Sequence, residues 1–287
     1  MSFRYALIGA AGYIAPKHIQ AIKDIGGELI AAYDPHDSVG ILDKYFSGCE
    51  YFSEFERFDR HIDKERRRGV YIDYLVICSP NYLHDSHCRY GLRNGMNVIC
   101  EKPLTLNAHN AVALMEIEDE TKKKVNNILQ LRLHPTIIEL KERIEKDKTY
   151  NVQLTYNTPR GKWYHSSWKG DEKKSGGIAT NIGIHFFDML QWIFGREERS
   201  VVKFHNEDNA AGFLKLEGAN VDWTLSLKGE VKREMKIDGF YNIDFSQGFT
   251  DLHTLSYKNI LEGKGFSIED VLPSIGMVEK IRNTTNK

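Results

Sequence analysis

The chain has 287 residues, a length that suits two domains rather than one small domain. Its composition, 41% hydrophobic and 28% charged, is that of an ordinary globular protein. The 39 Lys and Arg residues nearly balance the 40 Asp and Glu residues, giving a net charge of −1. With no basic surplus and no long apolar stretch, we expect neither a nucleic-acid partner nor a membrane partner.

The cysteines are too widely spaced for the usual zinc or redox motifs. The four of them stand at positions 49, 78, 88 and 100, and no two form a C-x-x-C pair. Cys78 and Cys100 lie in apolar runs, as small buried side chains do. The chain begins with a short apolar run rather than a signal peptide. We therefore expect a cytoplasmic protein with reduced cysteines and no metal site.

The first part of the chain alternates between predicted strands and helices. Strands are expected at 3–8, 28–33, 72–78 and 97–100, and helices at 15–25, 39–46, 58–67, 84–94 and 107–123. This alternation is typical of an α/β domain with a mostly parallel sheet covered on both faces. The pattern predicts that residues 1–123 form one such α/β domain.

In the rest of the chain, the predicted strands no longer alternate with helices. A strand at 125–131 and a helix at 134–146 are followed by strands at 151–156, 201–204, 210–216, 221–227 and 234–239, with one helix at 184–193 among them. Helices at 251–261 and 267–282 close the chain. We expect an α+β domain over 124–287 with an open, mainly antiparallel sheet. A homo-oligomer would cover the open face of that sheet.

A glycine turn joins the first predicted strand to the first helix, in the sequence GAAGYIA from Gly9 to Ala15. Backbone N–H groups and the helix N-terminus at such a turn can hold a pyrophosphate, so Gly9, Gly12, Tyr13 and Ile14 are candidate cofactor residues. Asp34 ends the second strand, where a carboxylate can bind both ribose hydroxyls and repel a 2′-phosphate. These features favour NAD over NADP; the alternative is a purely structural turn capped by Asp34.

The stretch NVICEKPLTL, from Asn97, places a lysine at the carboxyl end of an apolar strand. Ligands bind at these strand ends in parallel sheets. Pro103 directs Lys102 away from helical geometry. A partly buried lysine there can act as a base; the alternative is an ion pair with Glu101. Further on, Asn181, His185 and Asp188 are spaced to share one helix face within an apolar run, which suggests a second polar site.

Together these pieces resemble the glucose-fructose oxidoreductase and inositol dehydrogenase family over nearly the whole chain. The shared features are the glycine turn, SPNYLH from Ser79, the Glu-Lys-Pro motif and the GGIATNIGIHFFD run from Gly176. The resemblance implies NAD(P)-dependent oxidation of sugars or polyols, with Lys102 and His185 as catalytic groups. Many members have Asp where this chain has Asn181. The family pairs an NAD-binding Rossmann domain, here residues 1–123, with an open-sheet domain. It also places the Ser79 turn beside the nicotinamide, so Ser79, Asn81, His84, Glu101 and Lys102 join the candidate cofactor residues; for Asn81 and His84 the alternative is a helix-capping turn.

Several segments are similar to one branch of the family, the UDP-N-acetylglucosaminuronic acid 3-dehydrogenases of bacterial O-antigen synthesis. They are GAAGYIAP from Gly9, LQLRLHP from Leu129, RGKWY from Arg160, SWKGD from Ser167 and GFTDLHT from Gly248. Asn181 fits this branch, some of whose members reoxidise NADH with 2-oxoglutarate.

A uronate substrate carries a carboxylate and a diphosphate, for which Arg160 is a natural bidentate partner. Trp163 or Tyr164 could pack on the sugar or the uracil, and Asn181 and His185 complete the candidate substrate site. Arg132 is a further candidate that could instead pair structurally, while His253 and Thr254 rank last. Two alternatives stay open: a dehydrogenase of another sugar or of inositol, and a non-catalytic NAD-binding sensor.

Overall fold

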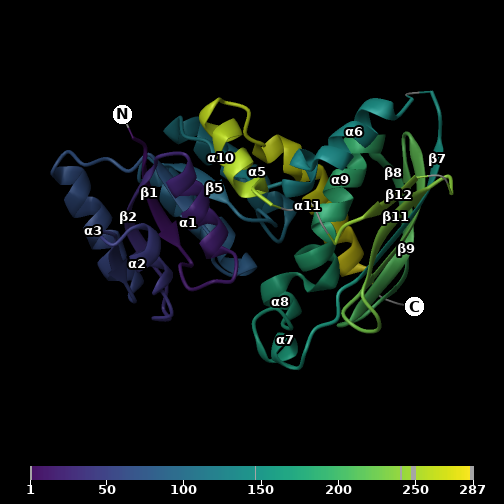
Figure 1. The fold of residues 1–287 in the computed structure, drawn as a ribbon, viewed down its shortest axis with the longest axis horizontal. Helices are drawn as coiled ribbons and strands as arrows, with labels where there is room; N and C mark the ends of the chain where they lie inside the picture. The colour runs from purple at the N-terminus through teal and green to yellow at the C-terminus, as the bar shows by residue number, and fades with distance from the viewer. Residues whose placement is uncertain (1, 146, 240, 247–249, 285–287) are drawn as a thin grey trace. The chain divides into compact units, whose positions relative to one another are not determined.

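The computed structural model describes residues 2–145, 147–239, 241–246 and 250–284 (Figure 1). The chain forms two compact units. Unit 1 comprises residues 1–105, 109–128 and 251–270, and unit 2 comprises 106–108, 129–250 and 271–287. Among the described residues, no helix is both long enough and apolar enough to cross a bilayer.

Unit 1 is built on a six-stranded parallel sheet. Its strands are β1 (Arg4–Ile8), β2 (Glu28–Tyr33), β3 (Glu50–Phe52), β4 (Tyr74–Ile77), β5 (Asn97–Cys100) and β6 (Val125–Asn127), in the order β3-β2-β1-β4-β5-β6. Every neighbouring pair is parallel. This order is that of a Rossmann fold, which confirms the predicted class. All four residues of β4 are buried, as expected for a strand covered on both faces.

The helices of unit 1 include one from the far end of the chain. They are α1 (Ala15–Asp24), α2 (Ile41–Tyr45), α3 (Phe55–Arg67), α4 (His84–Arg93), α5 (Ala108–Thr121) and α10 (Leu252–Leu261), with a short 3-10 turn at Asn81–Leu83. Tyr257 of α10 is fully buried in the same core as Tyr5 of β1, with ring centroids 6.1 Å apart. The first unit therefore extends beyond the 1–123 boundary expected from sequence, because β6 and α10 complete its sheet and core.

Unit 2 carries a second six-stranded sheet. Its strands are β7 (Tyr150–Asn157), β8 (Glu197–His205), β9 (Asn209–Leu216), β10 (Ala219–Ser226), β11 (Lys232–Ile237) and β12 (Tyr241–Asp244), in the order β12-β11-β7-β10-β9-β8. Only β7 and β10 pair in parallel, so the prediction of a mainly antiparallel sheet is confirmed.

One face of this sheet is covered and the other is open. On β10, Val221 and Trp223 are buried while Asp222 and Thr224 are exposed. The buried face packs on α9 (Ile184–Phe194), where Phe187 meets Trp223 edge-on with ring centroids 5.1 Å apart. The unit also contains α6 (Pro135–Arg143), α7 (Trp163–Ser166), α8 (Glu172–Ser175), a 3-10 turn at Gln130–Leu133 and a π-helical turn at Ala179–Gly183, while α11 (Ile268–Asn283) begins in unit 1 and continues into unit 2.

Two of the strands described were not predicted, and the strand expected at 125–131 is much shorter than predicted. β3 and β12 are edge strands of three and four residues, too short to show an alternating pattern. The expected strand at 125–131 ends at Asn127, and the chain then turns into the 3-10 segment Gln130–Leu133.

A buried ion pair ties the 3-10 segment to α9 in unit 2. Arg132 Nε and Nη2 donate to the two carboxylate oxygens of Asp188 at 2.9 and 2.8 Å. Ser274 of α11 donates to the same carboxylate at 3.1 Å. Both charged side chains are more than nine-tenths buried. Removing only one partner of such a pair is costly, because the other charge then stays buried without a counter-charge.

We therefore predict that Asp188→Ala lowers the stability of unit 2 by about 3 kcal/mol. The matched control is Asp222→Ala, which removes an exposed pair with Lys203 at 2.8 Å and should cost less than about 1 kcal/mol. Scanning calorimetry of both variants measures the difference. Equal shifts in the melting temperature would contradict a structural role for the buried pair.

Candidate active site

The glycine turn lies at the carboxyl end of β1 in unit 1. Gly9 has φ +92°, and a Cβ atom on it would come within 2.5 Å of the Cys78 backbone. A Cβ on Gly12 would stand 3.1 Å from the Gly9 carbonyl oxygen. Tyr13 follows almost fully exposed, and α1 begins at Ala15. The turn therefore brings bare backbone to the start of a helix, the arrangement that holds a pyrophosphate.

Asp34 is joined to this turn by its side chain. It lies directly after β2 and is 6% exposed, and its Oδ2 accepts the Ala11 N–H at 3.0 Å while its Oδ1 accepts the His36 N–H at 2.9 Å. Each carboxylate oxygen keeps a second lone pair for a ribose hydroxyl. The glycine turn and Asp34 thus fit an adenosine ribose and a pyrophosphate, and they fit NAD better than NADP because a 2′-phosphate would meet the carboxylate.

The Ser79 turn follows β4 and is linked by a histidine to the turn that follows β5. The ring nitrogens of His84 lie 2.8 Å from the Ser79 carbonyl oxygen and 2.7 Å from that of Pro103. Burial lowers the pKa of His84, while these carbonyl groups oppose the shift. Asn81 is also buried, at 4% exposure. His84 is thereby engaged within the protein, and its role in the structure is to hold the two turns together.

Lys102 lies half-buried at the carboxyl end of β5, one residue after the buried Glu101. Its backbone N–H donates to Glu101 Oε2 at 3.2 Å. The other oxygen of Glu101 lies 3.0 Å from His18 Nε2 and 3.2 Å from His253 Nε2. Both oxygens of Glu101 are therefore engaged with protein groups, and Lys102 is positioned by its own neighbour in the sequence.

In unit 2, the polar residues of the GGIATNIGIHFFD run occupy two kinds of helix. Asn181 lies in the π-helical turn, and its side-chain amide donates to the Tyr164 hydroxyl at 2.8 Å. His185 stands half-buried in the first turn of α9, whereas Asp188 further along α9 is bound to Arg132. Arg132 thus takes the structural role that the sequence left open.

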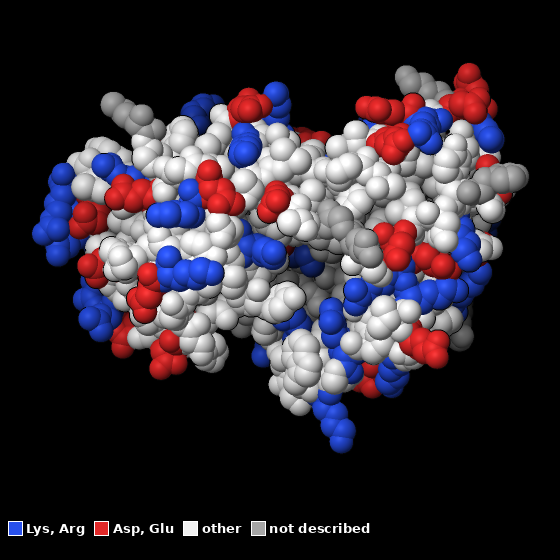
Figure 2. Space-filling view, viewed as in Figure 1, with Lys and Arg blue, Asp and Glu red and all other residues white. Residues whose placement is uncertain are grey.

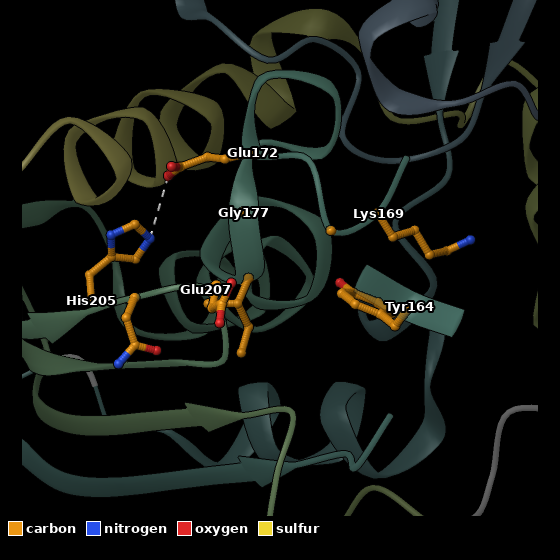
Figure 3. Close-up of a pocket in the computed structure, with 9 residues that line it drawn as sticks. Tyr164, Lys169, Glu172, Gly177, His205 and Glu207 are labelled. Atoms are coloured by element: carbon orange, nitrogen blue, oxygen red, sulfur yellow. Dashed lines mark ion pairs between the residues drawn. The ribbon is translucent and has the colours of Figure 1, made fainter. Parts of the chain in front are cut away.

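The Arg160 loop, residues 160–164, contributes Tyr164 to the lining of a cavity of about 240 Å³ within unit 2 (Figure 3). Arg160 and Trp163 are exposed, and Tyr164 is 3% exposed with its ring against the cavity. Figure 3 shows Tyr164 and Lys169 on one side and the ion pair of His205 with Glu172, 3.6 Å apart, on the other. The Lys169 ammonium lies 4.6 Å from the Trp168 ring centre. Burial and the charge of Arg160 lower the pKa of Lys169.

Lys169 and His18 were not predicted from the sequence as site residues. Lys169 lies in the SWKGD segment, but one lysine in a loop gives no signal that Arg160 stands close enough to shift its pKa. His18 is 235 residues (253 − 18) from His253, a candidate that ranked last, and both approach Glu101. Thr254, the other candidate that ranked last, donates to Asp24 at 2.8 Å.

Comparisons with known proteins match both units to one family. A family model described as "Oxidoreductase family, NAD-binding Rossmann fold" matches residues 3–128, and its companion, "Oxidoreductase family, C-terminal alpha/beta domain", matches 140–237. The chain belongs to this Gfo/Idh/MocA oxidoreductase family. Its first domain is an NAD-binding domain, in agreement with the glycine turn and Asp34.

Relatives within the Gfo/Idh/MocA family act on several sugars. The inositol 2-dehydrogenase of Rhizobium meliloti is 30% identical over 70% of this chain, and the match spans 58% of that relative's length. The WlbA (WbpB) dehydrogenase from Thermus thermophilus is 44% identical, with 99% of this chain and 96% of that chain covered. Its structures with NAD and alpha-ketoglutarate and with NAD and UDP-GlcNAcA give TM-scores of 0.96 and 0.95. The WlbA dehydrogenase from Bordetella pertussis, 21% identical at a TM-score of 0.81, shares the fold.

We predict that Asp34→Asn weakens NAD binding roughly tenfold to hundredfold, because the ribose hydroxyls lose a charged acceptor. The same change should narrow the preference for NAD over NADP, since the repulsion of a 2′-phosphate is removed. Titration calorimetry with both nucleotides tests this, with the exposed Asp37→Asn as the control. Unchanged NAD affinity in Asp34→Asn would contradict the ribose assignment.

Proposed function

We propose that this protein is an NAD-dependent dehydrogenase that oxidises the 3-hydroxyl of UDP-N-acetylglucosaminuronic acid to a ketone. The observation that carries this proposal is the 44% identity, over almost the full length of both chains, to the Thermus thermophilus dehydrogenase solved with NAD and UDP-GlcNAcA. The balanced reaction converts the secondary alcohol and NAD⁺ into the 3-keto sugar, NADH and one proton.

Lys102 and His185 are the proposed catalytic groups. When bound at the glycine turn and Asp34, NAD would supply the acceptor for the hydride from the carbon that bears the hydroxyl. One of the two side chains removes the hydroxyl proton, and the other polarises the oxygen. Lys102 suits this work because it is half-buried at the carboxyl edge of a parallel sheet, where ligands bind. Asn181 cannot act as a base, and we assign it to holding Tyr164 and the substrate.

Arg160 is the proposed partner of the substrate's carboxylate or diphosphate. The nearby Lys169 adds a second positive charge, and two neighbouring cations favour an anionic ligand. Trp163 is exposed and can pack on a sugar or uracil face, whereas Tyr164 is buried beneath it and positions Asn181. The site therefore suits a nucleotide sugar better than an uncharged polyol.

The wider setting of the reaction is also proposed. The relative's structure with alpha-ketoglutarate supports 2-oxoglutarate as the group that reoxidises NADH here. The four reduced cysteines fit a cytoplasmic reaction in bacterial O-antigen synthesis. The exposed face of the unit 2 sheet is the proposed contact between copies of the chain. Positive and negative side chains are intermingled on the face drawn in Figure 2, and we propose no nucleic-acid partner.

A dehydrogenase of inositol or of another sugar is the second candidate function, favoured by the 30% identical inositol dehydrogenase. A non-catalytic NAD sensor is disfavoured because the chain has both Lys102 and His185.

We predict that Lys102→Ala reduces kcat about a hundredfold to ten-thousandfold, the usual contribution of a positioned acid or base. NAD affinity should change little. Formation of NADH from UDP-N-acetylglucosaminuronic acid measures this, with the exposed Lys64→Ala as the control. Full activity in Lys102→Ala would overturn the catalytic assignment.

We also predict that Arg160→Ala raises KM for the uronate substrate roughly tenfold to hundredfold, because a charge-assisted hydrogen bond is lost. Inhibition by UDP-N-acetylglucosamine, which has the diphosphate but lacks the carboxylate, shows which group Arg160 binds. Weaker inhibition of the variant than of the wild type indicates a diphosphate contact, and unchanged inhibition indicates a carboxylate contact. An unchanged KM, equal to that of the exposed control Arg57→Ala, would rule out both.

A further inference from the structure

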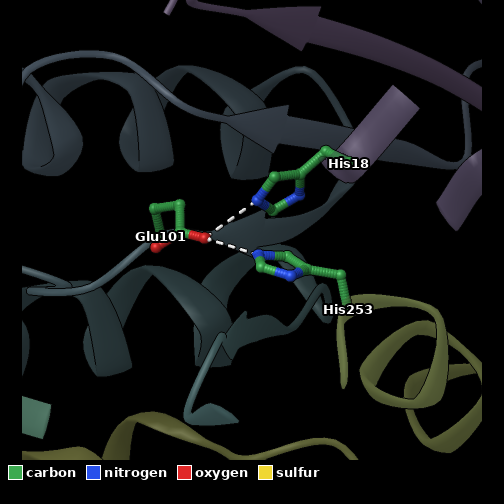
Figure 4. Close-up of side chains that lie close together, drawn as sticks. All are labelled: His18, Glu101 and His253. Atoms are coloured by element: carbon green, nitrogen blue, oxygen red, sulfur yellow. Dashed lines mark hydrogen bonds and ion pairs between the residues drawn. The ribbon is translucent and has the colours of Figure 1, made fainter. Parts of the chain in front are cut away.

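Two histidines flank the buried carboxylate of Glu101 in unit 1 (Figure 4), and a tyrosine is hydrogen-bonded to one of them. His18 comes from α1, His253 and Tyr257 come from α10, and Glu101 follows β5. Their exposed fractions are all 6% or less. The cluster therefore joins the helix after the glycine turn, the turn that carries Lys102 and a helix from the end of the chain, with very little exposure to solvent.

The hydrogen bonds of the cluster restrict where its protons lie. Oε1 of Glu101 is approached by His18 Nε2 at 3.0 Å and by His253 Nε2 at 3.2 Å. A protonated Oε1 would donate to one ring and accept from the other, whereas an ionised Oε1 accepts an N–H group from both. The lowered pKa of Glu101 favours the ionised form, a carboxylate that receives two N–H groups.

Tyr257 fixes the remaining nitrogen of His18. The Tyr257 hydroxyl lies 2.8 Å from His18 Nδ1. With its proton on Nε2, a neutral His18 has a lone pair on Nδ1, and the tyrosine hydroxyl donates to it. Burial lowers the pKa of His18, which favours the neutral ring, and raises the pKa of Tyr257, which keeps the hydroxyl protonated.

We propose that His18, His253 and Tyr257 form a positioning network that keeps Glu101 ionised and so fixes the backbone of Lys102. The second oxygen of Glu101 accepts the Lys102 N–H at 3.2 Å, which links the network directly to the residue assigned to catalysis. Neither histidine touches substrate in this account, and both act through Glu101. The inference rests on the proposed function for the role of Lys102, but not for the charge state of Glu101.

The physical balance at Glu101 explains why both histidines are needed. Burial raises the pKa of Glu101, but the hydrogen bonds from His18 and His253 outweigh it and hold the pKa well below its usual value. Loss of one donor therefore moves the pKa upward, and the carboxyl group protonates as the pH falls. Among the described residues, Glu101 also interacts with Tyr257 of α10, Cys78 after β4, His84 of α4 and Cys100 of β5.

The same three ligand atoms lie within 4.8 Å of one another, a spacing that a metal ion could use. A metal ion would have to replace the N–H protons that the two histidines donate to Glu101. We infer hydrogen bonding because this arrangement also accounts for the Tyr257 contact and for the Lys102 N–H.

The test compares three variants of α10 by the pH dependence of kcat/KM. His253→Leu removes the donor, and His253→Gln keeps an N–H group near the same place. Ser256→Ala changes a buried hydroxyl of the same helix that has no hydrogen-bond partner among the described residues. We expect the acid limb of His253→Leu to move up by about one to two pH units. His253→Gln should largely restore the wild-type profile, and Ser256→Ala should match it. If the pH profile of kcat/KM for His253→Leu coincides with that for Ser256→Ala, the proposal is overturned.

A second measurement is made on the wild-type protein and needs no turnover. Nitrogen-15 NMR of labelled histidines should show His18 neutral across the neutral pH range, with its proton on Nε2; the signal is assigned by its loss in His18→Gln. An imidazolium, a proton on Nδ1, or an equimolar transition metal in the purified protein would overturn the network. Inactivity on the uronate with the predicted His18 signal would refute the proposed function and leave the charge state of Glu101 intact.

Discussion

The buried carboxylate of Glu101 is the constraint on which unit 1 depends. An ionised group at 5% exposure is costly unless hydrogen bonds replace its water. Here the replacements come from α1, from α10 and from the backbone of Lys102. Because its pKa is depressed, the stability that Glu101 contributes is present above its usual pKa and is lost only as the pH falls through the lowered value. The turn that carries Lys102, the first helix α1 and the returning helix α10 are thus all bonded to one charged group.

Unit 2 also contains buried charged groups, in the ion pair between Arg132 and Asp188. Arg132 and Asp188 satisfy each other and fix α9, the helix that presents His185. Two positive groups, Arg160 and Lys169, stand near each other, and the lowered pKa of Lys169 reflects their proximity. Within the described part of the chain neither forms an ion pair with a carboxylate, and the two cations together are proposed to bind an anionic ligand.

Much of this could be read from the sequence because the signals are local. The alternation of apolar strands and helices predicted the parallel sheet, and the glycine turn with Asp34 predicted NAD. The Glu-Lys-Pro motif located Lys102 at the end of a strand. These features depend on neighbours within about twenty residues, a range over which turn chemistry and periodicity are informative.

The features that the sequence did not predict are formed by contacts between residues far apart in the sequence. Nothing near His18 indicates that His253 will meet it, or that α10 will return to complete the first core. The pairing of Asp188 with Arg132 was likewise hidden, since spacing alone placed Asp188 on the face of Asn181 and His185. Edge strands such as β3 and β12 are too short to leave a pattern. Tertiary contacts decide all of these cases.

The most direct test of the central claim is the near-ultraviolet absorbance of the purified protein before and after UDP-N-acetylglucosaminuronic acid is added in the presence of NAD. The account predicts that the absorbance band of reduced nicotinamide appears with the substrate and disappears when 2-oxoglutarate follows. A band that persists would retain the dehydrogenase and remove 2-oxoglutarate as the oxidant. No band from a protein shown to bind NAD would contradict the assignment of this substrate.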